Sequence, residues 1–118
     1  MNRPTLPADK MSPTAHEIVA KLHGDVVAEV AAAVEKERFV IVGMAQNPHV
    51  KAARRLLEAA GVKFTYLEYG SYLSKWRARL AIKLWAGFPT FPMVFIDGTL
   101  IGGASELEKL QAEGKLPK

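Results

Sequence analysis

The side chains that could take part in chemistry are basic and imidazole groups, because the 118-residue chain contains no cysteine. The absence of a thiol excludes disulfides, thiolate metal sites and a cysteine nucleophile. Lys75, Arg79 and Lys83 recur every four residues, a spacing that gathers them into a basic stripe on one helix face. His16 and His23 stand without a cluster of carboxylates or thiols, so we predict no metal site. The basic stripe instead favours an anionic ligand.

Composition and charge predict a single globular domain around these groups. Apolar residues make up 49% of the chain, enough for an ordinary core, and the net charge of +4 is a mild bias toward anionic partners. No apolar run approaches the ~18 residues that suggest a membrane span, and residues 1–13 lack the apolar stretch of a secretory signal. We therefore predict a flexible leader, 1–13, one domain, 14–118, a cytoplasmic location and no membrane partner.

The first part of the chain is predicted to form two helices and a strand. Thr14 and Glu17 have the spacing of a capping box at the start of an amphipathic helix. Asp25 can cap a second helix, which ends in a charged cluster near residue 38. The block Phe39–Val42 is rich in β-branched residues, which predicts a strand buried on both faces at the centre of a sheet.

A helix, a strand and another helix are predicted next. Asn47 and Pro48 are typical of an N-cap and a first helical position, and their helix should run to Ala60. Val62–Glu68 alternates in the manner of a strand. The segment Ser71–Ala86 is predicted to be a helix whose apolar residues face the core, namely Leu73, Trp76, Leu80, Leu84 and Trp85.

A hairpin and a final helix complete the pattern. Asp97-Gly98 separates two short apolar runs and predicts the tight turn of a β-hairpin. Ser105 and Glu108 have the spacing of a capping box, which predicts the start of the last helix. The chain from residue 39 onward therefore reads as strand, helix, strand, helix, hairpin and helix.

This order of elements, with Phe88-Pro89-Thr90-Phe91-Pro92 just before the hairpin, resembles the glutaredoxins, and the segment is most similar to that of the monothiol, Cys-Gly-Phe-Ser type. The resemblance implies an α/β protein with the thioredoxin-like (glutaredoxin) fold, a four-stranded mixed sheet flanked by helices, with an N-terminal helical extension. It also implies a cis peptide bond between Phe91 and Pro92.

The resemblance places Asn47-Pro48-His49-Val50 where the family has its active-site tetrapeptide. Asn47 stands at the nucleophilic cysteine and Val50 at the resolving one, so we expect neither dithiol nor monothiol exchange and predict no catalytic residue. The family's [2Fe–2S] cluster uses the first cysteine, and we therefore expect no iron–sulfur cluster. Asn47 is expected to cap its helix and His49 to be solvated, while Met44 stands about where the family has a lysine.

What the resemblance leaves in place is a groove for glutathione. Lys83 would hold its glycine carboxylate, and the backbone of Phe91 would pair with its cysteinyl part as an added strand does. The start of the last helix would receive the γ-glutamyl carboxylate, with Ser105 in place of the family's usual aspartate. The residues predicted to bind glutathione are Lys83, Thr90, Phe91, Pro92, Gly103, Ala104 and Ser105.

These observations predict a redox-inactive, cysteine-less relative of the glutaredoxins that is not an enzyme. It would bind glutathione, a protein partner at the groove beside Pro92, or both. Three alternatives stay open: an oxidoreductase classed with its family, a nucleic-acid-binding domain that uses its basic, aromatic helix, and an enzyme that activates glutathione as glutathione S-transferases do. The last is the weakest of the three, since the chain is too short for the helical second domain of those transferases.

Overall fold

The computed structural model describes residues 4–71 and 73–117. Its strands are β1 (Phe39–Gly43), β2 (Thr65–Glu68), β3 (Met93–Ile96) and β4 (Thr99–Gly102). After a short 3-10 helix, η1 (Ala8–Lys10), its α-helices are α1 (Pro13–Lys21), α2 (Gly24–Lys36), α3 (Pro48–Ala59), α4 (Trp76–Ala86) and α5 (Ala104–Ala112). Residues 1–3 of the predicted leader and residue 72 of the predicted fourth helix lie outside the described residues. The division at residue 13 stays a prediction.

The four strands form one mixed sheet in the order β2-β1-β3-β4. β1 runs parallel to β2 and antiparallel to β3, and β3 runs antiparallel to β4. Asp97 and Gly98 both have positive φ at the turn between β3 and β4, as a tight hairpin requires. β1 is central and buried along its whole length. The predicted four-stranded mixed sheet with a central β-branched strand is therefore confirmed.

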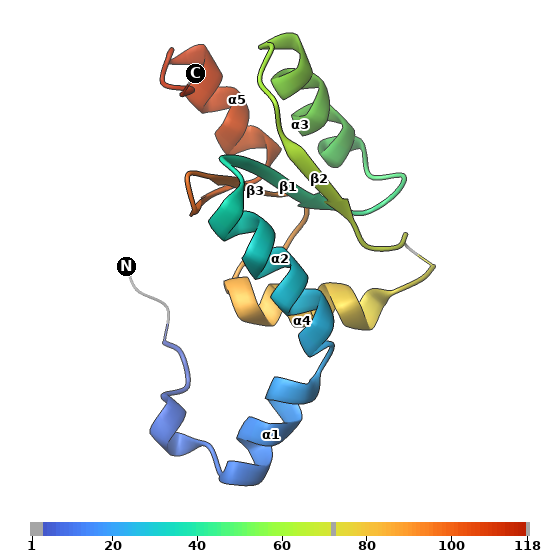
Figure 1. The fold of residues 1–118 in the computed structure, drawn as a ribbon, viewed down its shortest axis with the longest axis vertical. Coiled ribbons are helices and arrows are strands. Elements are labelled where there is room, and N and C mark those ends of the chain that lie inside the picture. The colour runs from blue at the N-terminus through green and yellow to red at the C-terminus, as the bar shows by residue number, and fades with distance from the viewer. Residues whose placement is uncertain (1–3, 72, 118) are drawn as a thin grey trace.

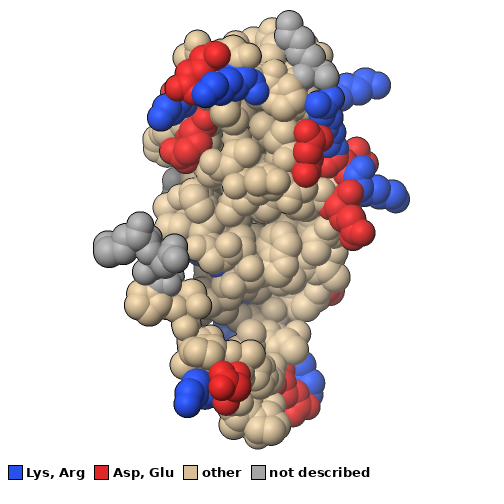
Figure 2. All heavy atoms as spheres, turned by 90° about the vertical axis from the view of Figure 1, so that its left-hand side faces the viewer, with Lys and Arg blue, Asp and Glu red and all other residues tan. Residues whose placement is uncertain are grey.

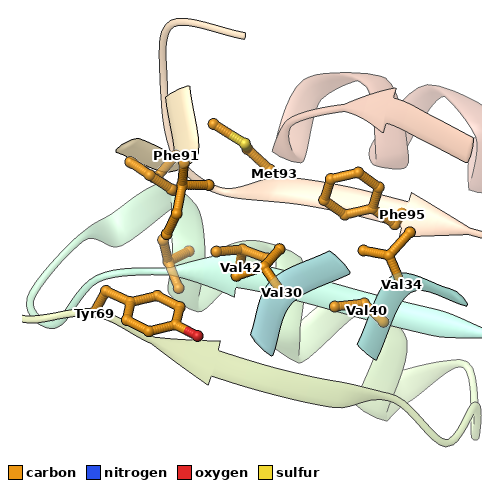
Figure 3. Packing of buried hydrophobic residues seen from close by; sticks show 10 residues of the cluster. Val30, Val34, Val40, Val42, Tyr69, Phe91, Met93 and Phe95 are labelled. Carbon is orange, nitrogen blue, oxygen red and sulfur yellow. The ribbon is translucent and has the colours of Figure 1, made fainter. Parts of the chain in front are cut away.

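One face of the sheet packs against α2 and α4. Alternate residues of a strand point to opposite faces, so Val40 and Val42 of β1 share this side. Figure 3 shows Val30 and Val34 of α2 beside these two residues, with Phe95 of β3 completing the layer. Each large side chain buried here contributes about 1.5–3 kcal/mol relative to leaving it exposed.

The other face packs against α3 and α5. Ile41, which lies between the two valines of β1, points to this side together with Val94 of β3. The helices contribute Ala53 and Leu57 from α3 and Leu107 from α5. The sheet is thus a middle layer between two pairs of helices, and α3 and α5 both begin near the same end of it (Figure 1).

The helix α1 projects from one end of the molecule, whose principal extents are 47 × 34 × 25 Å (Figure 1). No residue of α1 is buried, so this helix adds nothing to the core. Figure 2 shows a face on which charged side chains gather toward the two ends of the long axis and leave the middle largely uncharged. Among the described residues, no helix has the length and apolar character needed to cross a membrane.

The first helix starts earlier than predicted. Ser12 is the N-cap of α1, and its Oγ accepts a hydrogen bond from the N–H of Ala15 at 3.1 Å. Pro13 occupies the first helical position, where its fixed φ favours the helix. Thr14 therefore lies inside the helix, and Glu17 pairs with Lys21 at 2.8 Å instead of closing a capping box. The predicted box was wrong because an equally good cap stands two residues before it.

The second helix also begins before its predicted cap. His23 is the residue before α2 and has a left-handed conformation with φ of 44°. Asp25 therefore lies in the first turn, where its carboxylate interacts favourably with the positive end of the helix dipole but does not cap it.

The helix α4 differs most from its prediction. It begins at Trp76 rather than near Ser71, after a left-handed Lys75 with φ of 56°. Four of the large apolar residues predicted for the core are exposed instead: Leu73 is 96% exposed, Trp76 59%, Leu80 38% and Leu84 58%. Trp85 is 41% exposed, but its ring centre lies 5.9 Å from that of the core residue Phe95. The buried side carries Ala78 and Ala81 with Ile82. These small residues let α4 approach α2 closely, and the larger apolar side chains therefore face outward.

Candidate functional site

A cleft of about 520 Å³ lies between the starts of α3 and α5, the helix α4 and the segment before β3. It is lined by all seven residues predicted to bind glutathione, namely Lys83, Thr90, Phe91, Pro92, Gly103, Ala104 and Ser105. Asn47 and His49 line it too. A larger hollow of about 890 Å³ near the start of β1 contains none of these residues. The cleft is therefore the candidate site, although the role of each residue in it stays a prediction.

Asn47 opens α3 as its N-cap, which confirms its predicted structural role. Its Oδ1 accepts hydrogen bonds from the N–H of His49 at 2.9 Å and of Val50 at 3.2 Å. Pro48 follows at the first helical position, where a missing N–H costs no hydrogen bond. Asn47 is only 8% exposed. The amide therefore satisfies two N–H groups of the kind that would stabilise a thiolate at a helix start.

Val50 does not line the cleft but lies in the core, where it is 1% exposed. It packs against the end of β1 at Gly43, where an added Cβ would lie 2.7 Å from Val50 Cγ1 and 3.1 Å from the ring of Tyr66. Gly43 thus lets α3 approach the sheet closely. Sequence reasoning missed Gly43 because its role is a close approach between segments distant in the chain, and no turn signal marks it.

Lys83 extends from α4 into the cleft and is partly exposed. Its Nζ lies 5.7 Å from the centre of the Phe91 ring. An ammonium over an aromatic face is attracted by the ring quadrupole, which keeps the lysine beside the segment that precedes β3. Lys83 therefore brings a full positive charge next to the residues predicted to contact glutathione.

Arg79 also lines the cleft, but its predicted place on a solvated basic stripe is wrong. It is 7% exposed, and its Nη1 donates to the carbonyl oxygens of Tyr69 and Ser74. The guanidinium therefore fastens the loop before α4 to that helix. Lys75 is exposed as expected and lies outside the cleft.

The segment before β3 contributes Thr90, Phe91 and Pro92. The peptide bond between Phe91 and Pro92 is cis. Phe91 is anchored in the core layer that Figure 3 shows, while Thr90 is exposed. A Cβ on Gly103 would lie 3.3 Å from the carbonyl oxygen of Pro92, so the small residue lets the start of α5 come close to this segment.

Gly103 is the N-cap of α5, and its N–H donates to Oε1 of Glu106 at 2.7 Å. This is one half of a capping box, since glycine has no side chain to supply the other half. The predicted box of Ser105 with Glu108 is therefore wrong, and Ser105 lies exposed in the first turn. Sequence reasoning missed Glu106 because a glycine N-cap carries no side-chain signal of a helix start.

The charges in the cleft favour an anion, with one opposing group. The starts of α3 and α5 direct the positive ends of their dipoles toward it, and Lys83 adds a full charge. The carboxylate of Glu106 opposes them at the start of α5. The cleft can bind an anionic, peptide-like ligand, but the chain has no thiolate with which to attack one.

The histidines do not assemble a metal site. Within residues 4–71 and 73–117, no group of three or more His, Asp or Glu side chains could hold a metal ion. Nε2 of His16 lies 2.8 Å from the carbonyl oxygen of Ala8, which ties η1 to α1. His49 is exposed at the cleft, as expected for a solvated residue.

Comparison with known sequences identifies the family. Residues 40–101 match the family model described as glutaredoxin. The chain belongs to the glutaredoxin family. It is 53% identical over 94 residues to a glutaredoxin-like protein of Dictyostelium discoideum, covering 80% of this chain and 76% of that protein. It is 30% identical over 83 residues to glutaredoxin-C2 of Arabidopsis thaliana, covering 70% of this chain and 75% of that one.

Solved glutaredoxin structures share the fold. A mutated buckwheat glutaredoxin superposes with a TM-score of 0.71 at 21% identity, covering 86% of this chain and 88% of that one. A buckwheat glutaredoxin in complex with glutathione has a TM-score of 0.68 at 21% identity, covering 79% of this chain and 84% of that one. The fold is therefore the thioredoxin-like fold of glutaredoxins, as predicted, and this glutaredoxin-like protein contains no cysteine.

Proposed function

We propose that this glutaredoxin-like protein is a redox-inactive binding module that holds glutathione without a covalent bond. The observation that carries the proposal is the cleft that Lys83, the segment ending at Pro92 and the start of α5 line together, beside the capping Asn47. The resemblance to glutaredoxins assigns Asn47 to the first cysteine position. The complex of the buckwheat glutaredoxin with glutathione supports the choice of ligand.

The ligand groups and the cleft have matching chemistry. Glutathione is a short peptide with a carboxylate at each end. In our proposal Lys83 Nζ pairs with the glycine carboxylate, and the backbone of Phe91 hydrogen-bonds to the cysteinyl part as an added strand would. The first amides of α5, at Ala104 and Ser105, receive the γ-glutamyl carboxylate. Thr90 and Gly103 line the space between these contacts.

The same cleft lacks what thiol chemistry requires. Disulfide exchange needs a thiolate that attacks a disulfide sulfur, and neither Asn47 nor Val50 can supply one. A [2Fe–2S] cluster of the family's kind needs a cysteine thiolate from the protein, so the donor set at Asn47 does not fit it. We therefore assign recognition, not catalysis, to this site.

We further propose that the chain derives from the monothiol, Cys-Gly-Phe-Ser type of glutaredoxin and that a protein partner docks at the groove beside Pro92. The support for the subtype is the segment Phe88–Pro92, which precedes the hairpin. The exposed Thr90 and the open cleft beside it would give an extended peptide access to the backbone there.

Titration calorimetry with reduced glutathione tests the proposal. We expect measurable heat at millimolar ligand and an affinity about fivefold weaker for Lys83→Gln, because a partly screened charge-assisted contact is lost. Lys75→Gln removes the same charge from a position outside the cleft and should leave the affinity unchanged. No heat and no NMR shift changes in the unmodified chain would remove glutathione from the proposal. Equal weakening of the affinity by both variants would exclude the cleft as the glutathione site.

An assay of hydroxyethyl disulfide reduction tests the redox half separately. We expect no turnover above the rate without protein, since the chain has no thiol. Turnover that scales with protein concentration would contradict the assignment of a binding role even if glutathione binds.

A further inference from the structure

The outward face of α4 carries large apolar side chains, whereas the buried residues of this helix are Ala78, Arg79, Ala81 and Ile82. Trp76, Leu80 and Leu84 follow one another at intervals of four residues and are 59%, 38% and 58% exposed. At about 100° of rotation per residue they occupy a sector of roughly 80°. A helix of a globular protein normally turns such a stripe toward the core. The exposed stripe therefore indicates a binding surface for another molecule.

The apolar sector continues onto a second helix. Leu84 and Trp85 line a groove together with Val19 and Leu22, from α1 and the residue after it. Val19 is 50% exposed. The C-terminal half of α4 and the projecting α1 thus form one apolar surface, with no charged residue among those that line the groove.

The charged residues of α4 that border the sector are positive, although Arg77 also lines a groove with Asp25, Glu29 and Glu68. Arg77 and Lys83 flank the stripe on opposite sides of the helix, and Arg77 stacks on Trp76 with its Cζ 5.3 Å from the ring centre. The chain has no acidic residue between Glu68 and Asp97. This combination of an apolar centre containing tryptophan and leucine with a basic border is typical of helices that lie in the interface of an anionic bilayer.

Other partners fit this surface less well. Nucleic acid would place cations and aromatic faces at the centre of the contact, whereas the centre here contains leucine side chains. Asp25 and Glu29 of α2 line a groove with Trp76, so the N-terminal end of α4 is less favourable for an anionic surface than its C-terminal end. The sequence predicts no membrane partner, because no apolar run is long enough to span a bilayer. Our inference departs from that prediction, since a helix that lies on a bilayer needs no long apolar run.

We infer that the outward face of α4, with the adjoining side of α1, binds the surface of an anionic lipid bilayer. The C-terminal half of α4 enters the interface most deeply, because Leu84 does not line the acidic groove and lies next to the apolar side of α1. This inference does not depend on glutathione binding, and its test contains no glutathione.

The fluorescence of the two tryptophans provides the measurement, since both lie in α4. The full chain is titrated with vesicles of phosphatidylcholine alone and with vesicles that also contain phosphatidylserine. We expect a blue shift of the emission and co-sedimentation with the phosphatidylserine vesicles only. The absence of both signals would overturn the inference. Equal signals with both vesicle types would overturn the part of it that assigns a role to the basic residues.

Two variants locate the surface. The double variant Leu80→Ser, Leu84→Ser keeps both tryptophans and should weaken vesicle binding at least about tenfold, because the buried apolar area falls. Arg77→Gln should weaken it about fivefold, and Arg55→Gln, an exposed arginine on α3, should leave it unchanged. Circular dichroism checks that each variant is folded, and Arg77→Gln keeps the test decisive if the double variant is not.

Alternative occupants are outcomes of the same experiment. Sedimentation velocity without lipid measures self-association of the chain and its Leu84→Ser variant. A dimer that Leu84→Ser dissociates, in a chain that does not bind vesicles, would overturn the inference in favour of a second copy. A tryptophan shift with single-stranded RNA but not with vesicles would overturn it in favour of nucleic acid.

Discussion

Asn47 is the residue that we propose stands where other glutaredoxins have their nucleophilic cysteine. Its side chain performs a purely structural task, the capping of α3 through the N–H groups of His49 and Val50. The same N–H groups would lower the pKa of a thiol placed there, because a thiolate accepts hydrogen bonds and is stabilised by the helix dipole. The N–H groups at the start of α3 would therefore stabilise a thiolate, which Asn47 cannot provide.

Introducing a thiol at this position tests that statement. Asn47→Cys is expected to attack glutathione disulfide, forming a mixed disulfide and releasing one reduced glutathione. With reduced glutathione as the electron donor, it should reduce hydroxyethyl disulfide at a rate well above that of the unmodified chain, which has no thiol. Mass spectrometry detects the adduct, and the pH dependence of alkylation should report a thiol pKa below about 8.5.

Asn47→Ser is the matched control, since serine also caps a helix but has no sulfur. It should show neither the adduct nor the activity. A cysteine variant that alkylates only as fast as an ordinary exposed thiol would contradict the proposed arrangement of the cleft.

Glu106 is the group in the cleft that opposes an anionic ligand. Glu106→Gln keeps an oxygen to accept the hydrogen bond of the Gly103 N–H but removes the negative charge at the start of α5. We expect glutathione to bind about threefold more tightly, measured by calorimetry at low salt, because a like charge leaves the site that we propose for the γ-glutamyl carboxylate. The control Glu108→Gln, on the same helix but outside the cleft, should change the affinity little. Unchanged affinity in Glu106→Gln would place the ligand carboxylate elsewhere.

Site residues were predictable where a local motif marks them. The segment ending at Pro92, Gly103 and Lys83 were found through the resemblance to glutaredoxins, and the structure brings them into one cleft. Gly43 and Glu106 could not be found in this way. The first acts through an approach between β1 and α3, and the second caps a glycine that carries no side-chain signal.

At the scale of elements, α4 shows the limit of periodicity. A spacing of four residues identifies a helix and its apolar stripe, but it does not say whether that stripe faces the core or a partner. Ala78 and Ala81 decide the matter, because small residues allow α2 and α4 to pack closely. The four-residue basic stripe was misleading for the same reason, since Arg79 turns inward and Lys75 remains outside.

Arg79 is expected to stabilise the fold through the loop before α4. Arg79→Ala leaves the carbonyl oxygens of Tyr69 and Ser74 without their charged donor, which should lower the free energy of unfolding by about 2–3 kcal/mol. Urea denaturation measures the change. Arg77→Ala, an exposed position on the same helix, should change it by less than about 0.5 kcal/mol. Similar values for the two variants would show that the buried hydrogen bonds of Arg79 contribute little.

At the scale of the whole molecule, the order of the elements, through the resemblance to glutaredoxins that it carries, predicted the mixed sheet. A β-branched run such as Phe39–Val42 can be buried on both faces only in a central strand, and the hairpin at Asp97-Gly98 then adds two antiparallel strands beside it. The helix starts were less predictable. The N-caps Ser12 and Gly103 each have a neighbouring residue that could also cap the helix. The free-energy differences between such caps are small compared with the packing energy that selects among them.

Two tyrosines make the stability of the molecule sensitive to alkaline pH. Burial, aided by a hydrogen bond from Tyr69 Oη to Glu29, raises the pKa of Tyr69 above its ordinary value of about 10. Burial and a hydrogen bond to Glu68 do the same for the pKa of Tyr66. The unfolded chain then releases phenol protons above pH 10 that the folded chain retains. The free energy of unfolding is therefore unaffected by these groups below pH 10 and falls as the pH rises above it.

Urea denaturation at pH 8 and pH 11 tests this expectation. The double variant Tyr66→Phe, Tyr69→Phe should lose less stability between the two pH values than the unmodified chain, because phenylalanine has no proton to release. An equal loss in both proteins would assign the alkaline destabilisation to other groups, such as the lysines.

The projecting α1 has a consequence for how this chain can change over generations. Since none of its residues is buried, substitutions there cost the folded sheet nothing, and selection on stability does not act on them. Selection on α1 can therefore act only through its contacts with other molecules. Removal of α1 is therefore expected to leave the sheet and the cleft folded.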